Sequence, residues 1–234
     1  MKPSKDKKAV ILMGPPGAGK GTQASLLAEK FSFYYLETSK LLEDSFKNAD
    51  DKEFITAGGK KYFLKEEKRL WETGVLCDPP FVSQLVKEKI KSLYDMGESI
   101  VLAGSPRTLF EGKALMPFLK KIFGKKNIKI VLINLSPKDS IFRNSHRRIC
   151  QLMRHPILYN KETLKLTKCP LDGSDLMKRK GLDDPKTIVV RLKEYRQRTF
   201  PLVSYFKKEG FGAKTVSGAG SVSDVFSKIL RAIK

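Results

Sequence analysis

The segment 14–22 reads GPPGAGKGT, a run of residue types that can hold a chain of phosphates. Its glycines let successive backbone N–H groups turn toward one anion, and Lys20 is long enough to reach the outer phosphates of a nucleotide. We therefore expect a nucleoside triphosphate site here, and the alternative is an ordinary glycine turn before a helix. The residues expected to contact the triphosphate are Gly17, Ala18, Gly19, Lys20, Gly21 and Thr22.

Arginines later in the chain could complete such a site, because a guanidinium group meets phosphate oxygens at two points. Arg143 and Arg147 are four residues apart and fall on one face of an expected helix. Arg107 follows the end of an expected strand, where ligands bind in parallel sheets, and Arg191 lies on a late helix. Phosphoryl transfer between two nucleotides requires several such groups around one point. Any one arginine alone is better explained by a solvated surface.

These residues need a strand before the loop and a helix after it, and the flanking sequence supplies both. Apolar runs at 9–13, 33–36, 99–103, 128–135 and 213–216 alternate with helix-forming segments. Near-continuous apolar strands separated by helices are typical of a parallel sheet covered on both faces. The sequence thus predicts an α/β fold, a P-loop core with helices on both faces of a parallel sheet.

Two segments interrupt this alternation. Residues 48–61 are polar and contain two glycines, so we expect a loop there, followed by a helix over 62–73. Regular structure also fails over 148–181, a segment of prolines and glycines long enough to indicate a functional flap. From Arg143 to Lys180 there are ten Lys or Arg residues against three acidic ones, so this flap is basic.

Composition excludes several classes of protein. No apolar run approaches the ~20 residues that span a bilayer, the first residues lack a secretory h-region, and three cysteines do not form a disulfide framework. We expect a cytoplasmic protein with free thiols. The net charge of +21 exceeds what a nucleotide site needs, so the surplus serves solubility, a polyanionic partner or a membrane surface. No motif predicts specific binding of nucleic acid.

The order of these features resembles the adenylate kinases of the long-lid type over nearly the whole chain. The features are GPPGAGKGTQ at 14–23, the turn GSPRT at 104–108, HRR at 146–148, the basic flap and RLKEY at 191–195. The resemblance implies a P-loop core formed by 1–37, 75–147 and 182–234, a nucleoside monophosphate-binding helical insert at 38–74 and a lid at 148–181. It implies transfer of a phosphoryl group from ATP to a nucleoside monophosphate, namely AMP, with Mg²⁺, by a monomer.

The resemblance also assigns roles to single residues. It makes Lys20, Arg107, Arg147 and Arg191 the catalytic group. On the ATP side it adds Arg143, Arg147, Ser221 and Val222 to the P-loop. The acceptor site would consist of Thr38, Arg107, Glu111, Arg179 and Arg191.

Departures from the family pattern leave alternatives open. Ala103 replaces an aspartate that helps to place Mg²⁺, and Glu43 replaces an arginine that grips the acceptor phosphate. Glu111 stands where a glutamine reads adenine, and a carboxylate can accept hydrogen bonds from adenine or guanine. Arg179 is separated from Asp183 by three residues, whereas family members have the arginine directly before the aspartate pair.

Some lids of this family hold zinc. The corresponding positions here include Cys150, Cys169 and Asp172, while Met153 is a poor zinc ligand. His146 or His155 could complete a set of four ligands, but the sequence favours a lid without metal.

Two classes of function remain. The first is a nucleoside monophosphate kinase, with AMP or another monophosphate as acceptor. The second is an ATP-binding protein on the same fold that has weak or no transfer activity and acts through its basic surface.

Overall fold

The computed structural model of the chain describes residues 7–47, 49–178 and 183–234. Its centre is a five-stranded parallel sheet with the strand order β10-β6-β1-β5-β2, which confirms the predicted fold class. The strands are β1 (Ala9–Met13), β2 (Tyr34–Glu37), β5 (Ile100–Ala103), β6 (Ile128–Asn134) and β10 (Lys214–Ser217). β1 is the middle strand and all five of its residues are buried, as its apolar sequence predicts.

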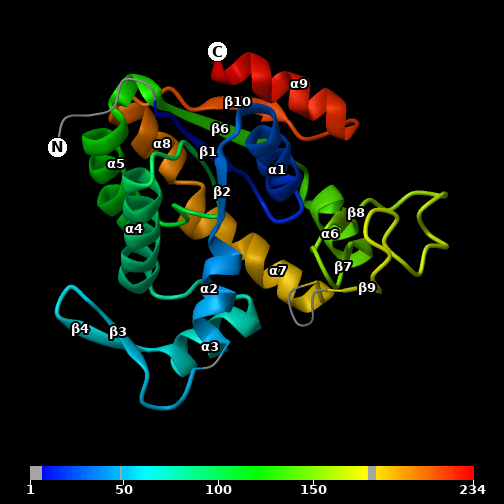
Figure 1. Ribbon diagram of the computed structural model, residues 1–234, viewed down its shortest axis with the longest axis horizontal. Coiled ribbons are helices and arrows are strands. Elements are labelled where there is room, and N and C mark those ends of the chain that lie inside the picture. Colours follow the sequence, from blue (N-terminus) through cyan, green and yellow to red (C-terminus); the bar gives the residue numbers. More distant parts are fainter. Residues whose placement is uncertain (1–6, 48, 179–182) are drawn as a thin grey trace.

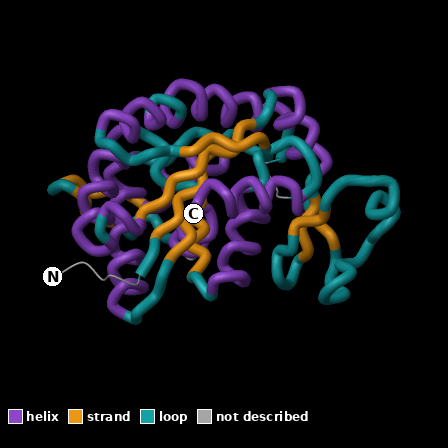
Figure 2. The backbone as a smooth tube through the Cα atoms, turned by 90° about the horizontal axis from the view of Figure 1, so that it is seen from above, coloured by secondary structure: helices purple, strands orange, loops and turns teal. Residues whose placement is uncertain are grey.

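Helices cover both faces of this sheet (Figures 1 and 2). Side chains alternate along β1, so that Val10 and Leu12 pack toward α1 and α9, while Ala9 and Ile11 pack in the core that contains α4, α5 and α8. The helices of the core are α1 (Lys20–Phe31), α4 (Pro79–Asp95), α5 (Leu109–Phe123), α6 (Pro137–His146), α7 (Pro185–Glu194), α8 (Leu202–Lys208) and α9 (Val222–Ile233). Two short helices, η1 (Lys125–Asn127) and η2 (Tyr195–Thr199), complete them.

The segment 38–74 corrects one expectation. Its elements are α2 (Thr38–Phe46), β3 (Phe54–Ala57), β4 (Lys60–Phe63) and α3 (Leu64–Thr73). The expected loop is thus partly an antiparallel hairpin, and the helix begins at Leu64 rather than at residue 62. Gly58 and Gly59 both have positive φ, which a two-residue hairpin turn requires. The hairpin extends away from the central sheet beside α2 and α3 (Figure 1).

The flap contains a small antiparallel sheet of its own, with the order β8-β7-β9. Its strands are β7 (Arg148–Cys150), β8 (Pro156–Ile157) and β9 (Leu176–Met177). In Figure 2 this sheet stands apart from the central one. Among the described residues, no helix is long and apolar enough to cross a membrane.

Candidate active site

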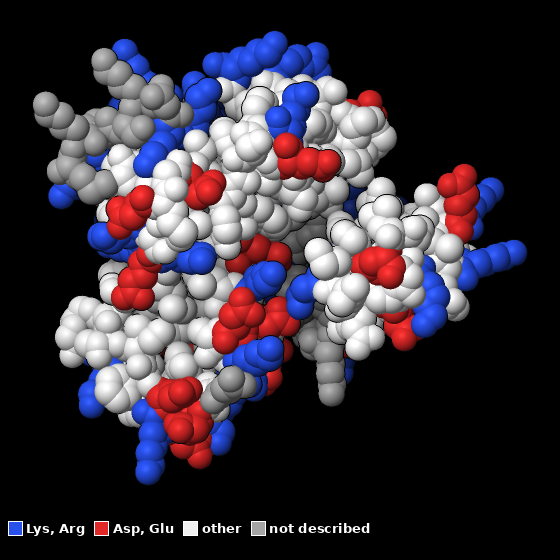
Figure 3. Space-filling model, in the orientation of Figure 1, with Lys and Arg blue, Asp and Glu red and all other residues white. Residues whose placement is uncertain are grey.

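A cavity of about 650 Å³ lies at the carboxyl end of the central sheet. Met13, Glu37 and Ala103, the last residues of β1, β2 and β5, line it, and the surface is hollowed between the flap and the rest of the molecule (Figure 3). The predicted residues that line this cavity are Gly17, Ala18, Gly19, Lys20, Gly21, Thr22, Arg107, Arg143, Arg147, Arg191, Ser221 and Val222. Side chains from five separate parts of the sequence therefore meet at one place.

The glycine loop at 14–19 is held in shape by helix α6. Ser140 donates a hydrogen bond from Oγ to the carbonyl oxygen of Pro16 at 2.6 Å. Gly17 has φ +76°, and a Cβ atom there would lie 2.5 Å from the Asn144 side-chain nitrogen. Only glycine fits both the conformation and the space, because an L side chain would be strained and would displace α6.

Lys20 is the first residue of α1 and closes over the loop. Its ammonium group donates to the carbonyl oxygens of Gly14 at 2.7 Å and of Pro15 at 2.8 Å. Burial lowers the pKa of Lys20 well below its ordinary value, and the charges of Arg107, Arg191 and Arg147 lower it further. The four predicted catalytic cations therefore lie within electrostatic range of one another. A polyphosphate would relieve their mutual repulsion.

Arg143 in α6 and Arg147 directly after it bind neighbouring segments of the chain. Arg143 donates from Nη2 to the carbonyl oxygen of Gly218 at 3.0 Å, which joins α6 to the loop after β10. Ser221 ends that loop and caps α9 by accepting a hydrogen bond from the backbone of Asp224. Arg147 forms an ion pair with the buried carboxylate of Asp183, next to the start of α7.

The turn 104–108 places Arg107 beside Thr38. A Cβ atom on Gly104 would lie 3.2 Å from both the Thr38 hydroxyl and an Arg107 guanidinium nitrogen. The Thr38 hydroxyl is buried and makes no hydrogen bond to the described residues. Burial lowers the pKa of Arg107, whereas the nearby Glu111, Cys77 and Glu37 raise it. Arg107 thus lines the cavity, whereas the predicted site residue Thr38 is buried behind it and is not among the lining residues.

Glu111 does not line the cavity. Its buried carboxylate accepts hydrogen bonds from the Ser105 hydroxyl at 3.1 Å, the Arg107 backbone N–H at 3.0 Å and the Thr108 hydroxyl at 3.2 Å. Burial raises the pKa of Glu111, and these hydrogen bonds oppose the shift. In this structure Glu111 fixes the turn that carries Arg107. Arg179 lies outside the described residues.

Glu43 is paired with the flap. Arg154 donates from Nη1 to Oε1 of Glu43 at 3.1 Å, and the same nitrogen lies 3.0 Å from Oε2. Arg154 also lines the cavity and has φ +60°, which is unusual for a residue with a side chain. The carboxylate at position 43 is thus balanced by a cation from a segment more than a hundred residues away.

Sequence reasoning missed Arg154 and Glu37 as site residues. Glu37 could have been found, because it ends a strand immediately before Thr38, and strand ends carry ligand-binding groups in parallel sheets. Arg154 has no comparable signal, because its partner is distant in the sequence.

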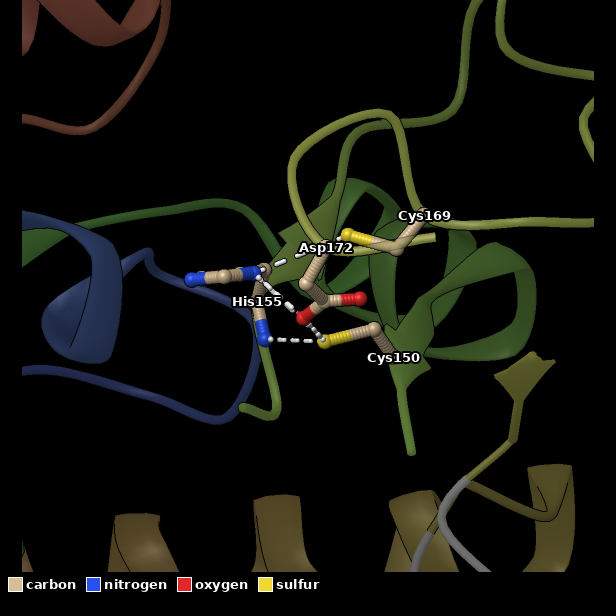
Figure 4. Close-up of side chains that lie close together, drawn as sticks. All are labelled: Cys150, His155, Cys169 and Asp172. Atoms are coloured by element: carbon tan, nitrogen blue, oxygen red, sulfur yellow. Dashed lines mark hydrogen bonds and ion pairs between the residues drawn. The ribbon is translucent and has the colours of Figure 1, made fainter. Parts of the chain in front are cut away.

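Four side chains of the flap form a cluster with metal-binding character (Figure 4). The donor atoms of Cys150, His155, Cys169 and Asp172 all lie within 4.8 Å of one another. Nδ1 of His155 is 3.5 Å from the Cys150 sulfur, 3.6 Å from the Cys169 sulfur and 3.1 Å from Oδ2 of Asp172. Four ligands at the usual zinc distances of about 2.0–2.3 Å would be separated by roughly 3.3–3.8 Å, so the set fits a tetrahedral ion.

Neighbouring groups orient these donors. The backbone N–H of His155 donates to the Cys150 sulfur at 3.1 Å. The backbone and hydroxyl of Ser174 bind Oδ1 of Asp172, and hydrogen bonds from Ser174 and then from Cys150 hold the pKa of Asp172 below its usual range. His155, rather than His146, completes the set, and Met153 is largely exposed. The preference for a lid without metal is thus weakened by the geometry.

Comparisons with known proteins agree with the site. The family model for adenylate kinase matches residues 12–211. An adenylate kinase of Methanothrix thermoacetophila is 31% identical over 226 residues, which cover 96% of this chain and 97% of that protein. An adenylate kinase of Clostridium kluyveri is 34% identical over 96% of this chain and 97% of its own length, and one of Clostridium botulinum is 34% identical over 94% and 95%. The chain, with its glycine loop and converging arginines, belongs to the adenylate kinase family.

Proposed function

We propose that this protein transfers the terminal phosphoryl group of ATP to AMP and forms two molecules of ADP in a reversible reaction. The observation that carries this proposal is the convergence of Lys20, Arg107, Arg147 and Arg191 on one cavity behind a glycine loop. Phosphoryl transfer needs two polyanions held end to end, and this requires several fixed cations in a place that excludes water. The cations that line this cavity therefore support the proposal.

The chain's own residues act by positioning and charge. Lys20 and the loop N–H groups hold the outer phosphates of ATP, Arg143 and the loop at 218–222 hold its base side, and Arg147 and Arg191 stabilise charge on the transferring group. Thr22 lines the cavity and supplies a hydroxyl that can bind Mg²⁺. When bound, Mg²⁺ would neutralise negative charge on the phosphates. No covalent intermediate is required.

The acceptor side is proposed to be formed by Thr38, Arg107 and Arg191. Arg107 lines the cavity and can bind a phosphate, and the buried Thr38 hydroxyl close to it has no hydrogen-bond partner among the described residues. Because Glu111 is engaged by the turn, we assign it to the positioning of Arg107, and its reading of the acceptor base remains a prediction, as does the role of Arg179. We further propose that 38–74 acts as the acceptor insert, that 148–181 acts as the lid, and that one chain suffices for activity.

The test is ADP formation from ATP and Mg²⁺ with AMP, GMP, CMP, UMP and dAMP in parallel. Lys20→Ala is the control for contaminating host kinase. AMP-driven turnover that depends on Lys20 supports the proposal. Preference for GMP would make Glu111 the first residue to mutate in a search for the determinant of base specificity. ATP binding without any turnover would refute the kinase function.

We also propose that the lid binds zinc through Cys150, His155, Cys169 and Asp172. Two thiolates, an imidazole and a carboxylate form an ordinary zinc donor set, and the three distances from His155 Nδ1 to the other donors support it. Metal analysis of protein purified without a histidine tag tests this proposal. One equivalent of zinc is expected, and its absence after growth with added zinc would contradict the proposal.

A second function is favoured by a separate surface feature. Near the amino ends of β1 and β6 lies a hollow of about 890 Å³ with an apolar floor and no carboxylate side chain among its lining residues. Its cations are Lys8, Lys30, Lys126, Lys129, Arg231 and Lys234. Basic side chains also gather at the upper edge of Figure 3, above the end of α9. We propose that a polyanionic partner binds here, and salt-sensitive binding of polyglutamate that is lost in Lys126→Glu/Lys129→Glu would support it.

A further inference from the structure

Glu37 occupies a position in the sheet from which it can serve the metal ion of the substrate. In the parallel pairing of β2 with β5, Glu37 is the register partner of Ala103. Both residues end their strands and both line the cavity. Ala103 carries no group that could hold a hydrated cation, whereas the longer side chain of Glu37 starts only one strand away, at about 4.8 Å.

The side chains of Glu37 and Ala103 project from the face of the sheet that α1 covers. Tyr35 and Val101 are register partners two residues earlier, and both pack in the core that contains α1. A Cβ atom on Gly21, in the first turn of α1, would lie 3.2 Å from the Tyr35 hydroxyl. Side chains alternate along a strand, so Glu37 shares this face and lies two residues, about 7 Å, nearer the carboxyl end of the sheet than Tyr35, which also lines the cavity. Its carboxylate therefore faces the start of α1.

Other carboxylates of the cavity are placed differently. Among the described lining residues, Asp139 and Glu194 come from helices. Asp139 belongs to the cap of α6, and Glu194 binds the Leu76 backbone and Arg198. Glu37 is the only described carboxylate of the cavity that comes from a strand end. Its Oε1 accepts a hydrogen bond from Ser39 at 2.6 Å, while Oε2 accepts none from the described residues.

A carboxylate at this place needs a cation between itself and a bound triphosphate. Glu37 lies within electrostatic range of Arg107, because its charge raises the pKa of that guanidinium group. Because β5 lies between β1 and β2 in the sheet, Glu37 stands beside the turn 104–108, where a carboxylate without a cation would repel phosphate oxygens. A hydrated divalent ion removes this conflict, since Mg²⁺ keeps several waters and is commonly held through one or two carboxylates together with phosphates.

We propose that Glu37 is the residue that positions hydrated Mg²⁺ on ATP in this protein, in place of a carboxylate at position 103. The inference rests on the proposed function only in that ATP binds with Mg²⁺. It predicts that Glu37 strengthens the binding of Mg²⁺·ATP and does not strengthen the binding of ATP alone. The substitution Glu37→Gln tests this well, because an amide oxygen can still accept the hydrogen bond from Ser39.

The experiment is calorimetric titration of ATP without any acceptor, once with Mg²⁺ and once with excess EDTA. Glu37→Gln should bind Mg²⁺·ATP about tenfold more weakly, as expected for loss of one charge-assisted hydrogen bond. In EDTA its affinity for ATP should be unchanged or higher. Equal weakening under both conditions would overturn the proposal, since it would indicate a structural role or a direct contact with the nucleotide.

Two further variants sharpen the test. Ala103→Asp in the Glu37→Gln background should restore the Mg²⁺-dependent affinity, because the new carboxylate starts from the neighbouring register position. Asp139→Asn is the matched control, and its affinities should show no Mg²⁺-specific change. Failure of the rescue, or an equal Mg²⁺-specific loss in the control, would overturn the assignment. If the protein binds Mg²⁺·ATP but transfers no phosphoryl group, the kinase proposal fails while these titrations still decide the role of Glu37.

Discussion

The ion pair between Glu43 and Arg154 should set how readily the flap closes on the insert at 38–74. The two groups are 3.0 Å apart, and their side chains are 39% and 32% exposed, so water screens them strongly. At the dielectric constant of water, unit charges in contact attract by about 1 kcal/mol, and measured exposed pairs reach about the same value. Glu43→Gln should therefore lower the ratio of closed to open molecules by up to about fivefold.

Charge reversal extends this prediction. Arg154→Glu replaces the attraction by a repulsion, so closure should weaken by roughly fivefold to thirtyfold. The double variant Glu43→Arg/Arg154→Glu should recover most of the loss, because the pair is restored with opposite polarity. Arg154→Gly is the control for the backbone, since it removes the guanidinium group at a position with φ +60° that glycine adopts without strain.

The assay is single-molecule energy transfer between the flap and the insert. Dyes attached through unnatural amino acids at Lys161 and Lys52, which are both exposed, leave the three cysteines unmodified. The effect should shrink in 1 M salt, where charges are screened within about 3 Å. If the effects of the two charge reversals on closure simply add in the double variant, an ion pair does not control closure. A coupling between the two positions that salt does not change would refute the idea as well.

Three other predictions follow from the structure. Burial raises the pKa of Glu67 to about 7, so the folded protein prefers the neutral acid and loses stability as pH rises from about 4.5 through 7. Glu67→Gln should therefore raise the free energy of unfolding by on the order of 2 kcal/mol at pH 8 and leave it unchanged at pH 4. Urea denaturation at the two pH values measures this difference. Cys169→Ser should abolish bound zinc in metal analysis and remove the effect of EDTA on the melting temperature. An unchanged zinc content would exclude Cys169 and its three neighbours as the zinc ligands. Gly17→Ala should weaken ATP binding by at least about tenfold in calorimetry, because the methyl group would lie 2.5 Å from Asn144; undiminished affinity would mean that the loop tolerates displacement of α6.

The core of the fold could be predicted because its signals are local. A buried strand, a glycine loop and a helix follow one another within residues 9–31, and each element agrees with its neighbours. The hairpin at 54–63 was missed because Lys60 and Lys61 make the second strand polar and its side chains are mostly exposed. The Gly58-Gly59 turn between residues of high strand propensity was the available signal.

The site could be predicted where function depends on residue type and position along one element. Lys20 and the arginines belong to this group, since each stands at a strand end or a helix face that the pattern identifies. Glu111 shows the limit of such reasoning, because its sequence position indicates a base contact while its hydrogen bonds fix a turn. The contact of Glu111 with Thr108 follows the S/T-x-x-E spacing of a helix start, whereas its contacts with Ser105 and the Arg107 backbone depend on how the turn folds.

The flap shows how one local conformation can serve two sites. Cys150 and His155 are five residues apart, which is longer than the usual spacing between paired ligands, and they meet because the chain turns back between them. Within this turn the backbone N–H of Arg154 donates to the carbonyl oxygen of Cys150, and Arg154 adopts a positive φ. The same turn that brings His155 to Cys150, Cys169 and Asp172 also directs the Arg154 side chain to Glu43. A residue with a side chain persists in this conformation at a cost of about 1–2 kcal/mol only if its surroundings hold it there. A bound metal ion would hold the turn, so the order of the lid and its grip on the insert at 38–74 depend on the same six residues.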